Sequence, residues 1–94
     1  MQIIYPGFLF QLARDGDIKG MESLLQRIGT PKSPRVVMKL NSLDDNKFGV
    51  LHYAARYEHF EMVKIIVFWG ADVNIRGDDG LTPLHFAAKY EILL

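Results

Sequence analysis

An eight-residue segment occurs twice in this chain, and this repetition constrains the fold more than any other feature. The two copies are residues 51–58, LHYAARYE, and residues 84–91, LHFAAKYE, so the offset is 84 minus 51, or 33 positions. The same offset places residues 40–41 over residues 73–74. A fixed period of this length indicates a repeat architecture, in which each unit buries its apolar face on its neighbours.

The residues within each copy predict helices separated by turns. Thr82-Pro83 can start a helix, because the Thr hydroxyl caps free N–H groups and Pro is tolerated in the first turn. Gly70 can end a helix, since glycine adopts the left-handed conformation without strain. The sequence predicts helices at residues 8–14, 18–28, 51–57, 61–69 and 84–90. It predicts a core that contains Leu51, Ala54, Ala55, Val63, Ile66, Leu84 and Ala87.

Two motifs resemble a known repeat family. Residues 79–88 read DGLTPLHFAA, and residues 70–74 read GADVN. These segments resemble the ankyrin repeat, whose period is about 33 residues and whose signature is Thr-Pro-Leu-His-x-Ala. The resemblance implies an all-α ankyrin-repeat solenoid, with an inner helix, an outer helix and a short hairpin-like finger in each repeat. It implies a single domain over residues 1–94 with about two and a half repeats.

The three copies differ in completeness. The first, over residues 8–40, is degenerate and aligns with the second at an offset of 42, so it contains about nine extra residues. We place them in an inserted loop at residues 30–37 and predict irregular structure over 30–36, because two prolines lie there. The second copy is residues 45–77, and the third, residues 78–94, is truncated before an outer helix.

Charge and cysteine content exclude several classes of function. The chain has 11 basic and 11 acidic residues, so we expect neither nucleic acid nor an anionic membrane as its main partner. One local exception is residues 31–39, which contain three bases and no acid. With no cysteine, disulfides and thiolate metal sites are excluded, and a reducing, cytoplasmic location is expected, with the nucleus as an alternative. No uncharged segment is long enough for membrane insertion.

Several residues have both a functional and a structural interpretation. In the ankyrin resemblance, His52 and His85 bridge neighbouring repeats through hydrogen bonds, and no ligand set supports a metal site there. Trp69 is a hot-spot candidate or, as we favour, a packing residue. His59 is expected in an exposed turn. Nothing predicts a catalytic triad, a cofactor or any other catalytic site.

Two further segments suggest covalent modification. Thr30-Pro31 and Ser33-Pro34 resemble proline-directed phosphorylation sites, although such dipeptides are common. Asn74 matches an Asn that is hydroxylated in some members of the ankyrin family, or it is simply a hairpin residue, which we favour.

The sequence thus predicts a non-catalytic protein–protein interaction module, acting as a scaffold or adaptor. Its partner is another protein, or the neighbouring repeats of a longer chain. In the latter alternative it is an N-terminal fragment of an ankyrin array in a channel or signalling protein and acts as a scaffold in cis. Solenoids bind through extended concave surfaces. The predicted contact residues are Leu43, Asp44, Lys47, Tyr53, Arg56, Tyr57, Arg76, Asp78, Asp79, Phe86, Lys89 and Tyr90.

Overall fold

The computed structural model describes residues 6–92, with side chains from Phe8 to Lys89. This part of the chain contains helices and turns and no strand, which confirms the prediction of an all-α solenoid. In chain order the α-helices are α1 (Pro6–Asp15), α2 (Ile18–Ile28), α3 (Pro34–Leu40), α4 (Val50–Arg56), α5 (Phe60–Trp69) and α6 (Pro83–Ile92). A short 3-10 helix, η1 (Asp78–Gly80), precedes α6.

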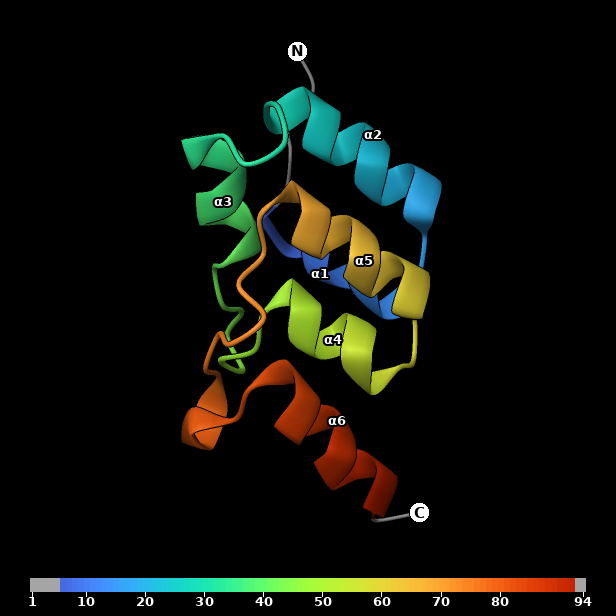
Figure 1. Cartoon of the computed structure of the whole chain (residues 1–94), viewed down its shortest axis with the longest axis vertical. Coiled ribbons are helices and arrows are strands. Elements are labelled where there is room, and N and C mark those ends of the chain that lie inside the picture. The colour runs from blue at the N-terminus through green and yellow to red at the C-terminus, as the bar shows by residue number, and fades with distance from the viewer. Residues whose placement is uncertain (1–5, 93–94) are drawn as a thin grey trace.

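The helices stack in layers along one axis (Figure 1). The inner helix α4 packs between α1 and α6, while the outer helices α2 and α5 pack on α1 and α4 and on each other. The molecule measures 43 × 22 × 22 Å, so it is about twice as long as it is wide. Such a stack is stabilised mainly by contacts between neighbouring layers.

Capping residues set several helix ends. The Asp17 carboxylate accepts a hydrogen bond from the Gly20 N–H (3.0 Å) at the start of α2. Gly70 follows α5 with φ of 126°, and its N–H donates to the Ile66 carbonyl (3.1 Å). At α6, Thr82 Oγ1 accepts from the His85 N–H (3.3 Å), so Thr82-Pro83 starts this helix as predicted.

The core lies between the inner and outer helices. Of the predicted core residues, Leu51, Ala54 and Ile66 are buried, and Val63 is partly buried against them. The largest fully buried side chains include Met21, Leu25, Leu40 and Met62, which come from α2, α3 and α5.

The prediction that Leu84 belongs to the core was wrong. Its side chain is 76% exposed, whereas Phe86 on the same helix is 3% exposed. In the described part of the chain α6 has an inner-helix neighbour, α4, on one face only, and Phe86 lies on that face. Ala87 and Ala55 are only partly buried.

The inserted segment is shorter as a loop than predicted, because helix α3 occupies its second half. Residues 30–33 are irregular, but residues 34–40 are helical, so the prediction of irregular structure to residue 36, and of a loop to residue 37, was wrong. Pro34 occupies the first turn, where the missing N–H has no helical partner. Val36 and Leu40, one turn apart, are buried and anchor the helix on the core.

Hydrogen bonds join α3 and its preceding turn to the end of α5. The Lys32 N–H donates to the Trp69 carbonyl (2.9 Å), and the Asn41 side chain donates to the Gly70 carbonyl (3.2 Å). Asn41 Oδ1 also accepts from the Asp72 N–H (2.7 Å). The Trp69 side chain is 9% exposed, which confirms the packing interpretation.

Candidate protein-binding groove between the fingers and the inner helices

Two fingers project from the stack, residues 41–49 before α4 and residues 70–82 before α6 (Figure 1). Asp44 organises the first finger, because its Oδ1 accepts from the N–H groups of Asn46 and Phe48, both at 3.0 Å. The Asp44 N–H also donates to the Phe48 carbonyl (2.8 Å). A carboxylate that accepts from nearby backbone N–H groups in this way stabilises a turn.

The two fingers are bonded to each other. The Asp78 N–H of the second finger donates to the Lys47 carbonyl of the first (2.8 Å), and the Gly77 N–H donates to the Leu81 carbonyl within the second finger (2.8 Å). A Cβ atom at Gly77 would lie 2.6 Å from the Lys47 carbonyl oxygen, so only glycine allows this approach. The fingers therefore form a pair of fixed spacing.

His52 bridges consecutive repeats, as the ankyrin resemblance implies. The Gly49 N–H donates to His52 Nδ1 (3.1 Å), which leaves Nε2 to donate to the Leu81 carbonyl (2.8 Å). The ring is fully buried, and this burial lowers its pKa, although the Leu81 carbonyl and the Asp44 charge favour the protonated form. His52 is thus a neutral structural residue.

His85 occupies the matching position in the next repeat but differs in environment. It is exposed, and its Nδ1 lies 2.9 Å from Thr82 Oγ1 within the same helical turn. The bridge is therefore observed at His52 and not at His85 within the described residues.

Tyr53 lies at the centre of an aromatic cluster. Its hydroxyl donates to Asp44 Oδ2, and burial together with this hydrogen bond raises the pKa of Tyr53 to about 12. Its ring packs edge-on against Phe10 and Phe48, with centroids at 6.2 and 6.4 Å. Phe48 in turn packs on Phe86 at 4.2 Å. The phenol is a fixed, neutral donor, and the rings link all three repeats.

A pocket of about 380 Å³ opens between the two fingers and α4. Arg56 and Tyr57 form part of its wall, with the guanidinium carbon 4.2 Å from the centroid of the Tyr57 ring. The lining residues are Asn46, Phe48, Tyr53, Arg56, Tyr57 and Asp78. A pocket with aromatic and charged walls is suited to receiving a side chain of a protein partner.

The structure thus brings four of the predicted contact residues together: Tyr53, Arg56, Tyr57 and Asp78. Sequence reasoning missed Asn46 and Phe48, although they flank the predicted Lys47 and could have been found from the turn that Asp44 forms. Outside the pocket, five predicted residues have exposed side chains, namely Leu43, Lys47, Arg76, Asp79 and Lys89.

Two predicted contact residues lie elsewhere. The prediction that Phe86 contacts a partner was wrong, because Phe86 is buried between α4 and α6 and packs on Phe48 and His52. The side chain of Tyr90 lies outside the described residues.

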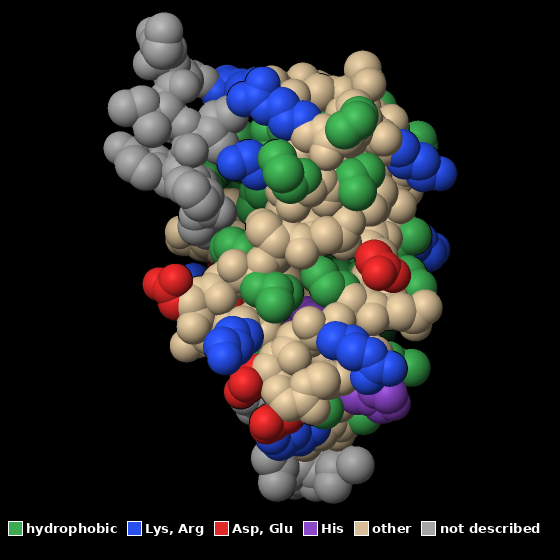
Figure 2. Space-filling model, turned by 90° about the vertical axis from the view of Figure 1, so that its left-hand side faces the viewer, with side chains coloured by type: hydrophobic (Ala, Val, Ile, Leu, Met, Phe, Trp, Pro, Cys, Tyr) green, Lys and Arg blue, Asp and Glu red, His purple; other side chains and the backbone are tan. Residues whose placement is uncertain are grey.

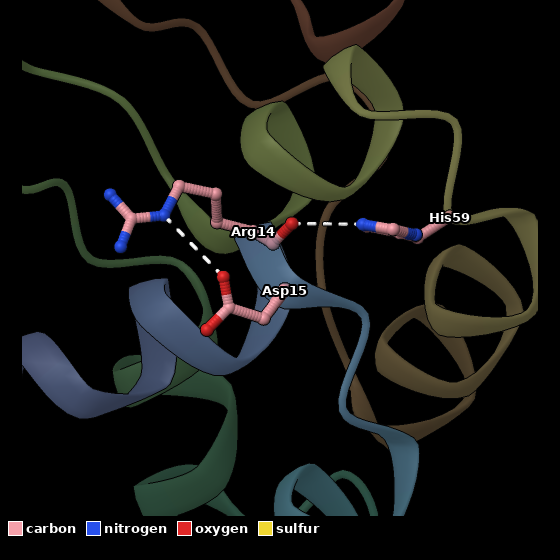
Figure 3. A network of polar contacts seen from close by, with 3 residues as sticks. All are labelled: Arg14, Asp15 and His59. Carbon is pink, nitrogen blue, oxygen red and sulfur yellow. Dashed lines mark hydrogen bonds and ion pairs between the residues drawn. The ribbon is translucent and has the colours of Figure 1, made fainter.

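His59 has a structural role at the opposite ends of the helices. Figure 3 shows its ring pointing at the Arg14 carbonyl, with Nε2 at 2.8 Å, beside the Arg14–Asp15 ion pair. The residue is half-buried instead of fully exposed, and it packs over Gly16 in the turn between α1 and α2. His59 therefore ties the turns of the first two repeats together.

The side chains at the candidate modification sites differ in solvent exposure. Thr30 is exposed, whereas Ser33 Oγ is buried and has no hydrogen-bond partner within the described residues. Asn74 is exposed in a turn where its N–H donates to Asp72 Oδ1 (2.9 Å). This turn fits the favoured hairpin interpretation of Asn74, and phosphorylation of Thr30 or Ser33 stays an untested resemblance.

Between residues 6 and 92, no helix has the length and apolar character needed to cross a membrane. Over the same residues, no group of three or more His, Asp or Glu side chains is placed to hold a metal ion.

Stacked helix pairs with bonded fingers and a His bridge define a helical repeat solenoid that presents a grooved surface. A family model described as ankyrin repeats, in three copies, matches residues 9–93. The chain belongs to the ankyrin-repeat family. Ankyrin repeats are protein–protein interaction modules, and the family is generally non-catalytic.

Proteins of several organisms are similar in sequence to this chain. A transient receptor potential cation channel subfamily A member 1 homolog of Caenorhabditis elegans is 35% identical over 82 residues, which is 87% of this chain and 6% of the channel homolog. An ankyrin repeat-containing protein of Schizosaccharomyces pombe is 44% identical over 55% of this chain and 25% of its own length. The Notch-regulated ankyrin repeat-containing protein of Xenopus tropicalis is 33% identical over 85% of this chain and 67% of its own length. The chain therefore spans a small part of the first two relatives.

Proposed function

We propose that this protein is a scaffold or adaptor whose groove, between the two fingers and α4, holds a side chain of a protein partner. The observation that carries the proposal is the pocket of about 380 Å³, which four predicted contact residues help to line. Its partner is another protein, and a cytoplasmic location belongs to the same proposal, supported by the absence of cysteine.

The fixed geometry of the groove supports this function. The bond between Asp78 and Lys47 holds the finger spacing, and the Tyr53–Asp44 hydrogen bond fixes one wall. A surface that is ordered before binding loses little conformational entropy when a partner docks. Tyr and Arg, which wall the pocket, are enriched among residues that dominate binding energy.

Site-specific photo-crosslinking and mutation together test the proposal. A photo-crosslinking amino acid at Asn46, which lines the pocket, should capture a protein from cells, and the same amino acid at Lys64, an exposed site on α5, should not. Tyr57→Ala should then weaken binding of that captured protein about tenfold, while Lys64→Ala leaves it unchanged. Equal capture at both positions, or unchanged binding by Tyr57→Ala, would contradict the groove.

A second candidate function is scaffolding in cis within a longer array, and the exposed face of α6 favours it. Leu84 is 76% exposed, and His85 has an exposed ring where His52 in α4 bonds to the following repeat. The similarity to a cation channel homolog supports the same candidate. Adding a consensus ankyrin repeat after residue 94 should protect the His85 ring from solvent in proton NMR. An unchanged His85 environment would contradict this candidate.

A further inference from the structure

Residues 23–43 form a segment of concentrated positive charge. Between Glu22 and Asp44 there are four bases and no acid, so this segment carries a charge of +4 while the whole chain carries zero. The four residues are Arg27, Lys32, Arg35 and Lys39, and we call them the basic face.

The basic face is assembled from neighbouring elements. Arg27 lies in the last turn of α2, and the backbone of Lys32 is bonded to the end of α5. Arg35 and Lys39 are one turn apart on α3, which packs against both α2 and α5. Figure 2 shows Lys and Arg side chains gathered over the upper part of this side, with hydrophobic side chains between them. The acidic side chains visible in that view lie lower.

Internal interactions do not account for this charge. In the described part of the chain, none of the four side chains forms an ion pair with Asp or Glu, and only Lys39 is partly buried. The carboxyl ends of α2, α3 and α5 lie near these residues, and each helix end carries about half a negative charge. Three such ends offset about 1.5 charges of four, so more than two positive charges remain uncompensated.

An exposed apolar side chain lies among the cations. Met38 is 64% exposed, and it follows Arg35 by three residues on α3 and precedes Lys39. Residues three and four apart share a helix face, so Arg35, Met38 and Lys39 are neighbours on the surface. A flexible Met side chain adapts to varied apolar partners.

We propose that the basic face binds an acidic, partly apolar segment of a partner protein, separately from the groove. Charge complementarity supports a short acidic segment, with an apolar side chain placed on Met38. A bilayer or a long duplex fits less well, because the two fingers lie on the same side of the stack as α3 (Figure 1), and their sequences contain Asp44, Asp45, Asp78 and Asp79. Their carboxylates would repel the phosphates of an extended anionic surface, whereas a short segment remains on α2 and α3.

A defined peptide tests this interaction. The probe is a fluorescein-labelled peptide of repeated Glu-Glu-Leu, and the control peptide carries Gln in place of Glu. Fluorescence anisotropy should show binding of the Glu peptide at about 50 mM salt and weaker binding at about 300 mM, because exposed charge pairs are screened. The Gln peptide should not bind at either salt concentration.

Two double variants with equal change in net charge separate the basic face from general electrostatics. R35E/K39E should lower affinity for the Glu peptide about tenfold. K19E/K64E alters exposed lysines on α2 and α5 outside the basic face, and it should retain affinity within about twofold. R35Q/K39Q, which only neutralises the charges, should give an intermediate loss, and circular dichroism should show native helix content in all variants.

Each of four results would overturn the proposal. These are absence of binding at low salt, equal binding of the Gln peptide, equal loss in the two charge-reversal variants, and tighter binding to phosphatidylserine-containing vesicles or duplex DNA than to the Glu peptide. The last result would assign the face to a membrane or to nucleic acid.

Discussion

Replacing His52 by alanine should remove the main polar link between the second and third repeats. The ring accepts from Gly49 and donates to the Leu81 carbonyl, and it packs against Phe48 and Phe86 with centroids at 5.4 and 5.7 Å. Because His52 is fully buried, water does not replace these contacts in the folded protein.

The expected cost of His52→Ala follows from these contacts. Each of the two hydrogen bonds contributes a net of about 1 kcal/mol, and a buried N–H left unsatisfied at Gly49 adds to the loss. Removing a buried ring of this size leaves a cavity that costs about 2 kcal/mol more. These contributions total at least about 4 kcal/mol, which is a large part of the free energy of unfolding of a small domain, about 5–15 kcal/mol.

His85→Ala is the matched control, since His85 has the same position in the repeat but an exposed ring. Its ring contacts Thr82 within one helical turn, so its loss should cost less than about 1 kcal/mol. Urea unfolding, followed by Trp69 fluorescence and circular dichroism, measures both variants. Equal destabilisation by the two substitutions would refute the argument that the burial of His52 and its contacts across the repeats carry the effect.

Four further predictions concern stability. Because burial lowers the pKa of His52, below about pH 6.5 the unfolded chain binds a proton that the folded protein excludes. As the pH drops from about 6.5 toward the folded pKa, the free energy of unfolding should therefore fall by up to about 1.4 kcal/mol per pH unit. In urea titrations, this fall should be steeper than that of a His52→Gln variant. Gly77→Ala, whose Cβ would lie 2.6 Å from the Lys47 carbonyl oxygen, should cost about 1–3 kcal/mol in the same assay, and no loss would mean that the fingers can separate. Glu58→Gly should stabilise the protein by about 0.5–1 kcal/mol in thermal melts, because Glu58 has a φ of 62°; a lower melting temperature would contradict this. Appending an outer helix and a polar capping repeat should raise the melting temperature, because they would cover Leu84. Equal amide protection of α5 and α6 in the protein without the cap would contradict the expectation that α6 is less stable than α5.

The periodic part of the fold could be predicted from the sequence because its determinants recur within each copy. Thr82-Pro83, Gly70 and the repeated Leu-His segment predicted α4, α5 and α6 closely. The His52 bridge followed from the family resemblance. The same reasoning failed at Leu84, since positional equivalence with Leu51 means equivalent burial only where both helices have neighbours on the same faces.

Features that depend on tertiary contacts were harder to predict. The prolines of residues 31–34 were interpreted as a loop. A proline can either interrupt a helix or begin one, so these residues alone do not distinguish a loop from the start of α3. Burial of Val36 and Leu40, which decides in favour of α3, depends on α2 and α5. Asn46 and Phe48 join the pocket only because the second finger bonds to the first at Lys47.

The chain of ring contacts from Phe10 through Tyr53 and Phe48 to Phe86 bears on the curvature of the solenoid. Aromatic rings are rigid plates with two side-chain torsions, and their contact distances set the tilt of each inner helix against the next. Exchanging one ring for a flexible side chain of similar volume would change the angle between layers before it unfolds a repeat. The width of the groove then depends partly on Phe10 and Phe86, two rings that do not line the pocket.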